Sequence, residues 1–200
     1  MNFAYVQPIF CPTEQMSERN INSINSFYDY YDLMKYDFKC VFGGYCATDE
    51  IWNNIKKIIK KRSNGKAKII RYDKNYGKAY IVNSLTKQLK NIDYFLTADS
   101  DILYKIDQLD IVSRLVEAFQ HATSIGLNPS LVALFQEEAN CHILELCYQN
   151  KYYYQGKLDY EMVCKPSIHG GVAGGCICID KKFWDLVGGY QILGVYAGDD

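Results

Sequence analysis

The sequence has 200 residues, of which 48 % are hydrophobic and 22 % charged, and 22 Lys and Arg residues against 23 Asp and Glu residues give a formal net charge of -1. These values are typical of soluble globular domains, and they exclude a disordered chain, a collagen-like repeat and a strongly basic nucleic-acid-binding tail. A chain of this length can bury most of its apolar surface without disulfide staples, as one large domain or two small ones.

The first half of the chain alternates predicted strands and helices. Apolar runs closed by turn residues predict strands over Phe3–Phe10, Phe38–Phe42, Ala67–Tyr72 and Tyr94–Ala98, with Gly43-Gly44 ending the second of them. Apolar positions at helical spacing predict three helices between these strands: one capped by Thr13 or Ser17, one from Asp49 to Ser63-Asn64-Gly65, and one over Ala79–Leu89. Strands and helices that alternate in this way are typical of βαβ units.

The second half continues the same pattern. It predicts a helix over Leu109–Ala122, strands over Leu131–Phe135 and Val172–Ile179, and a short helix over Phe183–Val187 that Gly188-Gly189 ends. The Tyr-rich segment Tyr148–Tyr160 is expected to form a surface loop or an edge hairpin. Since no internal repeat or linker is visible, we expect residues 1–200 to form a single α/β domain with a mostly parallel central sheet flanked by helices.

The cysteines point to a reducing compartment. None of the eight cysteines belongs to a C-x-x-C pair, and most lie in apolar runs, so we expect buried, reduced thiols rather than a zinc site or disulfides. Cys176 and Cys178 are expected to face one side of a strand. No signal-peptide pattern and no run of roughly 18 apolar residues is evident. We therefore expect a cytoplasmic protein.

Two carboxylates directly follow a continuous apolar strand, because Tyr94–Ala98 is succeeded by Asp99-Ser100-Asp101. Ligands of open parallel sheets bind outside the carboxyl ends of the strands. Carboxylates there supply hard oxygen ligands for Mn²⁺ or Mg²⁺, which usually share such a site with substrate phosphates and neutralise the charge on a departing diphosphate. Taken alone, however, Asp-x-Asp is more often a solvated turn or a helix cap.

Two further motifs surround this one. Asn75-x-Gly77-x-Ala79-x-x-x-Asn83 precedes the strand, and Phe183–Tyr190, with the letters FWDLVGGY, is followed by Gly198-Asp199-Asp200. In this order the three motifs resemble the nucleotide-sugar half of GT-A glycosyltransferases, especially those of family 2. The resemblance implies a Rossmann-like GT-A fold and metal-dependent transfer of a sugar from a UDP-sugar, with UDP-glucose favoured, to an acceptor hydroxyl. Because these enzymes usually continue beyond the acidic pair, it also implies either a domain shortened at its C-terminus or a minimal one, with the donor site present and the acceptor site partial.

The resemblance also assigns roles to individual residues. Asp99 and Asp101 would hold the metal ion, with Asp101 the better ligand and Asp99 also close to the ribose. Asp199 or Asp200 would face the acceptor hydroxyl, as a general base in an inverting transfer or as a positioning carboxylate in a retaining one. The nucleotide and diphosphate would be lined by Pro8, Asp73, Lys78 and Asn83, together with Asp99.

The base-binding position departs from the family pattern. Family 2 enzymes usually carry an acidic residue at the end of the second strand, where this chain has Val41–Tyr45 and only the following Thr48-Asp49 is similar. The identity of the nucleotide therefore stays open.

A basic cluster bears on the acceptor. The seven cationic residues of the cluster are Lys56, Lys57, Lys60, Lys61, Arg62, Lys66 and Lys68. A solvated helix face is the simpler explanation for Lys56–Arg62, and contact with nucleic-acid phosphate is the other. Met1–Asn20 and the residue usage resemble bacteriophage enzymes that add a second glucose to glucosylated hydroxymethylcytosine in DNA, which implies a DNA acceptor and the host cytoplasm. A surface glycan or a lipid acceptor stays open.

Two other functions remain as alternatives. A nucleotidyltransferase also uses an α/β sheet with acidic metal ligands, but it needs a Gly-rich basic loop after the first strand, where this chain has Cys11–Gln15. The second alternative is a nucleotide-sugar-binding domain that keeps the fold without complete catalytic machinery.

Overall fold

The computed structural model describes residues 2–31, 37–104, 131–133, 152–155, 161–164 and 176–190. In these ranges the strands are β1 (Phe3–Phe10), β2 (Phe38–Tyr45), β3 (Lys68–Arg71), β4 (Tyr94–Ala98), β5 (Leu131–Ala133), β6 (Tyr152–Gln155), β7 (Glu161–Cys164) and β8 (Cys176–Asp180). The helices described are α1 (Glu14–Tyr31), α2 (Asp49–Arg62), α3 (Lys78–Thr86) and α6 (Lys181–Val187). Strands and helices alternate up to β4, as the sequence predicts.

The central sheet is mixed and mostly parallel. Six strands lie in the order β3-β2-β1-β4-β8-β5, and β6 and β7 form a separate antiparallel pair. The β1 strand pairs parallel with β2 and β4, and β2 pairs parallel with β3, whereas β8 runs antiparallel to both β4 and β5. The predicted α/β class is therefore confirmed. Because β1 to β4 all run the same way, their carboxyl ends meet at one edge of the sheet, where ligands of such sheets bind.

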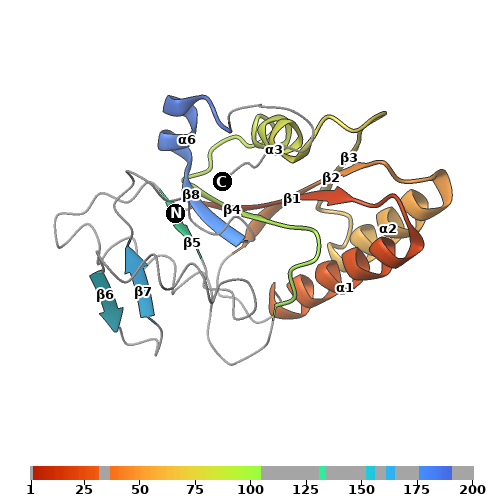
Figure 1. Ribbon diagram of the computed structural model, residues 1–200, viewed down its shortest axis with the longest axis horizontal. Helices are drawn as coiled ribbons and strands as arrows, with labels where there is room; N and C mark the ends of the chain where they lie inside the picture. The colour runs from red at the N-terminus through yellow and green to blue at the C-terminus, as the bar shows by residue number, and fades with distance from the viewer. Residues whose placement is uncertain are drawn as a thin grey trace.

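Helices cover both faces of the sheet (Figure 1). On one face, α1 and α2 pack on alternate strand residues that include Tyr5 and Phe42. On the other face, α3 and α6 pack on the intervening residues, which include Val6 and Phe95. This division follows from the alternation of side chains along each strand. It also explains why the buried strands are almost continuously apolar.

Capping residues mark the beginnings of α1 and α2 near the predicted places, whereas α3 ends at Thr86 and not at the predicted Leu89. The Thr13 hydroxyl accepts a hydrogen bond from the Met16 amide at 3.2 Å, so Thr13 rather than Ser17 begins α1. Thr48 caps α2 through the Ile51 amide at 3.3 Å, and this helix ends at Ser63. Gly65, with a φ of 75°, then reverses the chain.

The second strand is longer than predicted. The expectation that Gly43-Gly44 ends it is wrong, because β2 continues through both glycines to Tyr45. A Cβ atom on Gly44 would lie 2.0 Å from Cζ3 of Trp52, and one on Gly43 would lie 3.0 Å from the Leu85 methyl groups. The glycines therefore serve the close approach of α2 and α3 to the two faces of the sheet rather than a turn.

The described cysteines agree with the predicted reduced thiols. Cys11, Cys40, Cys176 and Cys178 are buried free thiols, and Cys46 is half-buried. Cys176 and Cys178 pack on the same face of β8, as their alternation predicts. Burial raises the pKa of Cys40 and of Cys176 to about 12, which keeps both thiols protonated at neutral pH.

Several predictions lie wholly or partly outside the described residues. They include the helix over Leu109–Ala122, the first part of the strand over Val172–Ile179 and the acidic pair Asp199-Asp200. The antiparallel pairing of β6 with β7 agrees with the hairpin alternative for the Tyr-rich segment. Among the described helices, none combines the length and the apolar character that crossing a bilayer requires.

Candidate functional site

The Asp-x-Asp motif forms a turn at the carboxyl edge of the sheet. Pairing between β1 and β4 ends at Val6 and Thr97, and β4 itself ends at Ala98. Asp99 follows as a half-buried residue and Asp101 as an exposed one. The turn places one carboxylate against the protein and the other in solvent, directly beyond the end of an inner strand.

An ion pair joins two of the predicted site residues. Nζ of Lys78 lies 2.9 Å from Oδ1 of Asp99, with 24 % and 36 % of the two side chains exposed. Lys78 is the first residue of α3, and Gly77 before it has a φ of 83°. That conformation favours glycine, and it turns the chain into α3 so that the ammonium group reaches the carboxylate.

The segment before α3 is held by local hydrogen bonds. Oδ1 of Asn75 accepts from the Gly77 amide at 2.9 Å, and the Tyr76 hydroxyl donates to Oδ1 of Asp73 at 2.9 Å. Acceptance by the Asp73 carboxylate raises the pKa of Tyr76. Asp73, predicted to line the nucleotide, is thus an exposed carboxylate that already binds a tyrosine of its own loop.

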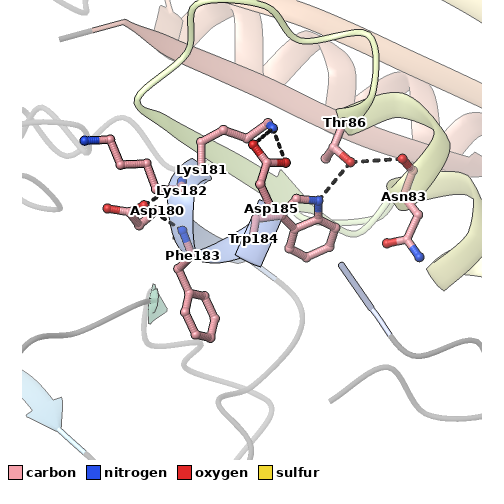
Figure 2. Close-up of polar contacts among 8 residues, drawn as sticks. All are labelled: Asn83, Thr86, Asp180, Lys181, Lys182, Phe183, Trp184 and Asp185. Carbon is pink, nitrogen blue, oxygen red and sulfur yellow. Dashed lines mark hydrogen bonds and ion pairs between the residues drawn. The ribbon is translucent and has the colours of Figure 1, made fainter. Parts of the chain in front are cut away.

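The Asn83 amide is used inside the protein. Its Nδ2 donates to the Tyr190 carbonyl and its Oδ1 accepts from the Tyr190 amide, both at 2.9 Å. Figure 2 shows the neighbouring chain of contacts, in which Nε1 of Trp184 donates to Thr86 at 3.1 Å and the Thr86 hydroxyl donates to the Asn83 carbonyl at 3.0 Å. Asn83 therefore ties α3 to the chain after α6, and its contact with a nucleotide stays a prediction.

The Gly-Gly-Tyr motif has a packing explanation. Gly188 and Gly189 have φ values of 81° and 88° and end α6. A Cβ on Gly189 would lie 2.5 Å from Oδ1 of Asn83, so only glycine leaves room for the amide that binds Tyr190. Asp180 begins the same helix by accepting from two backbone amides, which Figure 2 also shows. Two motifs far apart in the sequence are thus joined by direct contact.

Pro8 lies inside β1 rather than at its end. It is buried and stands opposite Gly43 of β2, and β1 continues to Phe10. On the other side of β1, pairing with β4 has ended at Val6. The missing N–H of Pro8 therefore leaves no gap in the β1–β4 ladder. The predicted contact of Pro8 with the nucleotide stays untested.

Asp49, the acidic residue after β2, forms an ion pair with Arg71. Oδ1 of Asp49 lies 2.6 Å from Nη1 of Arg71, and Nη2 of the same guanidinium donates to the Ala47 carbonyl at 3.0 Å. Asp49 is the residue whose position is similar to the base-binding acid of family 2. In this chain it joins the carboxyl ends of β2 and β3 through Arg71.

Buried polar residues beneath the Asp-x-Asp turn did not figure in the sequence prediction. Nε2 of Gln7 donates to Oγ of Ser23 at 2.9 Å and to the Asp99 carbonyl at 3.1 Å. The Tyr104 amide donates to Oγ of Ser26 at 3.1 Å, and its hydroxyl donates to that of Tyr5 at 3.2 Å. In the sequence, the polar Gln7 within the apolar run Phe3–Phe10 could have indicated a buried polar contact here.

The two carboxylates of the Asp-x-Asp motif are suitable ligands for a hard divalent cation whose other coordination positions are filled by water or substrate. Within the described ranges, no three His, Cys, Asp or Glu side chains gather to hold a metal ion. Asp99 and Asp101 supply carboxylate oxygens one residue apart, and Asp99 already holds a cationic group. Mg²⁺ and Mn²⁺ bind through one or two carboxylates together with water and substrate phosphates, so these two residues suffice as the protein ligands.

Comparisons with known proteins identify the fold. No protein-family model matches the sequence, and no curated protein does. Among solved structures, a mannosyltransferase from Pyrobaculum calidifontis in complex with GDP-Man and Mn²⁺ is similar over 100 % of this chain and 49 % of that chain, with 12 % identity and a TM-score of 0.67. GalNAc-T7 with UDP, GalNAc and Mn²⁺ is similar over 100 % and 39 % of the two chains, with 12 % identity and a TM-score of 0.57.

A third solved structure is a 4-diphosphocytidyl-2C-methyl-D-erythritol synthase from Anaerococcus prevotii, which is similar over 94 % and 73 % of the two chains, with 8 % identity and a TM-score of 0.52. At such identities the likeness shows the fold and not the function. The chain spans about half the length of the mannosyltransferase that it matches. The strand order, the helices on both faces and these likenesses together show that the chain has the GT-A fold.

Proposed function

We propose that the chain is a metal-dependent glycosyltransferase that transfers a hexose, with glucose favoured, from a UDP-sugar to an acceptor hydroxyl. The observation that carries the proposal is the ion pair of Lys78 with Asp99, beside exposed Asp101, at the carboxyl edge of the sheet. A leaving diphosphate needs positive charge, and a divalent ion needs carboxylates. Lys78 of α3 lies against the turn that carries the two carboxylates. The GT-A fold supports the same assignment.

The donor side of the reaction depends on three side chains. When bound, Mn²⁺ or Mg²⁺ neutralises the charge that develops on the departing diphosphate. Asp99 and Asp101 are the proposed ligands of this ion. Lys78 donates from its ammonium group to a diphosphate oxygen, which shares the developing negative charge. Pro8, Asp73 and Asn83 are the remaining proposed contacts of the nucleotide.

The acceptor side rests on the acidic pair. We propose that Asp199 or Asp200 faces the acceptor hydroxyl. In an inverting transfer this carboxylate takes the hydroxyl proton as the bond to the sugar forms. In a retaining transfer it positions the acceptor or stabilises positive charge on the sugar ring.

The proposed acceptor is glucosylated hydroxymethylcytosine in DNA, with a glycan as the second choice. Its support is the exposed face of α2, which carries Lys56, Lys57, Lys60 and Lys61. No acidic residue stands between Lys56 and Lys68, so the field of this face is positive and suits phosphate. Arg62 differs, because it forms an ion pair with Asp29 and lies over the Tyr28 ring. A bacteriophage enzyme acting in the host cytoplasm is the setting that this acceptor implies.

Hydrolysis of UDP-sugars with and without Mn²⁺ tests the donor half of the proposal. We expect UDP release that EDTA abolishes and that Asp101→Asn reduces at least 100-fold, because a metal ligand is lost. Glu50→Gln is the matched control, since it removes the charge of an exposed carboxylate on α2. Retained activity in Asp101→Asn would refute the metal site. Transfer to glucosylated hydroxymethylcytosine DNA and to a plain glycan then distinguishes the two acceptors.

A nucleotidyltransferase is the second candidate, favoured by the likeness to the Anaerococcus prevotii synthase. It would join a nucleoside triphosphate to a phosphorylated substrate and release pyrophosphate, whereas the proposed enzyme releases UDP. Pyrophosphate release from UTP with a sugar 1-phosphate therefore separates the two activities. Binding of UDP with Mn²⁺ in calorimetry, without turnover in either assay, would instead indicate a nucleotide-sugar-binding domain.

A further inference from the structure

A buried glutamine connects three parts of the protein beneath the Asp-x-Asp turn. Gln7 lies in β1, and its side chain is fully buried on the sheet face that α1 covers. Nε2 donates to Oγ of Ser23 on α1 at 2.9 Å and to the backbone carbonyl of Asp99 at 3.1 Å. One amide group therefore links a central strand and a helix to the peptide that carries the first carboxylate of the motif.

The orientation of this amide follows from its partners. A carbonyl oxygen only accepts hydrogen bonds, so the NH₂ group of Gln7 must face Asp99. The other end of the amide, Oε1, is buried and has no hydrogen-bond partner among the described residues. A buried polar atom without a partner is costly for the fold. An apolar side chain at this position would avoid that cost, and it would remove the shorter of two hydrogen bonds to the Asp99 carbonyl, which also accepts from the Ile102 amide at 3.4 Å.

The far end of the same turn is also fixed to α1 and β1. The Tyr104 amide donates to Oγ of Ser26 at 3.1 Å. The Tyr104 hydroxyl donates to the buried hydroxyl of Tyr5 at 3.2 Å. Within the turn, the Ile102 amide approaches the Asp99 carbonyl at 3.4 Å. Residues 99–104 are thus held at both ends, and the Asp99 peptide receives its side-chain donor from Gln7.

We propose that Gln7 is a positioning residue: by donating to the Asp99 carbonyl, it orients the Asp99 carboxylate toward the divalent cation and Lys78. The inference rests on the proposed function. Metal affinity depends on hydrogen bonds that orient the ligating carboxylates, since a free carboxylate must lose its freedom when it binds the ion. Gln7 itself contacts neither the ion nor the substrate.

A pair of variants separates positioning from packing. Gln7→Met keeps the length of the side chain and removes both hydrogen bonds, whereas Ser23→Ala removes only the bond to α1 and leaves the one to Asp99. Calorimetry gives the dissociation constant of Mn²⁺, measured in the presence of UDP. Paramagnetic resonance of the bound Mn²⁺ reports its ligand environment. Thermal unfolding gives the stability of each variant. We expect Gln7→Met to weaken Mn²⁺ binding about 10- to 100-fold and to change the resonance. Ser23→Ala should bind as the wild type does.

Other outcomes overturn the inference in distinguishable ways. Equal Mn²⁺ affinity in the wild type and folded Gln7→Met, or equal losses in both variants, would reduce Gln7 to a packing residue. Where Gln7→Met does not fold, Gln7→Asn takes its place, because it shortens the side chain by one methylene and moves the amide away from Asp99. This variant should also bind Mn²⁺ more weakly than the wild type. Failure of both to fold, with Ser23→Ala folded, would show that the amide serves the fold itself. Absence of Mn²⁺ and UDP binding in the wild type would refute the proposed function, and this inference with it.

Discussion

Lys78 and Asp99 meet through a 2.9 Å contact between Nζ and Oδ1, although they belong to different elements, the first turn of α3 and the end of β4. The ammonium group occupies one oxygen of the carboxylate that is proposed to bind the metal ion. Lysine and a divalent cation therefore compete for Asp99, while a bound diphosphate attracts both. We therefore expect Lys78 to weaken the binding of the metal ion alone and to strengthen the binding of the nucleotide with the metal ion.

Lys78→Met should separate these two effects. Without the ammonium group, Asp99 loses the competing ion pair with Lys78, so we expect Mn²⁺ alone to bind more tightly. UDP with Mn²⁺ should bind about tenfold more weakly, because one charged hydrogen bond to the diphosphate is lost. Calorimetric titrations with Mn²⁺ and with UDP plus Mn²⁺ measure both constants. Lys87→Met, at the other end of α3, is the matched loss of charge, and an equal effect of the two variants would contradict the role of Lys78.

The sequence predicted more of the fold than of the site. Apolar runs located β1 to β4 because buried parallel strands are continuously apolar, and Thr13 was one of the two predicted caps of the first helix. The resemblance named both Lys78 and Asp99, and the structure joins them in an ion pair, while their roles toward the nucleotide and the metal ion stay predictions. It assigned Asn83 to the nucleotide, which stays a prediction. The contacts of the Asn83 amide with Tyr190 could not be predicted, because they depend on tertiary structure. Gln7 was missed for the same reason.

Asn83→Asp should destabilise the fold. The substitution keeps an acceptor for the Tyr190 amide but sets a carboxylate oxygen against the Tyr190 carbonyl, where Nδ2 now donates. We expect the free energy of unfolding to fall by about 1–3 kcal/mol, because a part-buried hydrogen bond is lost and two acceptors then face each other. Urea unfolding measures this loss. Asn54→Asp on the exposed face of α2 is the control, and an equally small effect of both variants would show that the Tyr190 contact contributes nothing.

Gly44→Ala tests why the second strand contains two glycines. The added methyl group would lie 2.0 Å from the Trp52 ring, so α2 must shift away from the sheet. We expect a loss of about 1–3 kcal/mol in the free energy of unfolding, typical of an overpacked core. Gly43→Ala should cost less, because its nearest atoms include the methyl groups of Leu85 at 3.0 Å, which belong to a flexible side chain. Thermal unfolding ranks the two variants, and a milder effect at Gly44 would contradict the close approach of Trp52.

The buried thiols should make the fold sensitive to alkaline pH. Burial raises the pKa of Cys40 and of Cys176 from 9.0 to about 12. Below pH 9 both the folded and the unfolded chain keep these protons, so the two thiols cause no loss of stability there. Between pH 9 and 12 the unfolded chain loses them while the folded chain retains them, so the free energy of unfolding falls as the pH rises. We expect about 1 kcal/mol of loss per thiol at pH 10.

Urea unfolding of the wild type and of Cys176→Ala at pH 7 and pH 10 measures this dependence. The variant lacks one of the raised pKa values, so its stability should fall less between the two pH values than that of the wild type. Peptide-resolved alkylation of the native protein at pH 8 provides an independent measurement, because a buried protonated thiol does not react. Cys40 and Cys176 should stay unmodified until the chain is unfolded. Rapid modification of either in the native protein would contradict their burial.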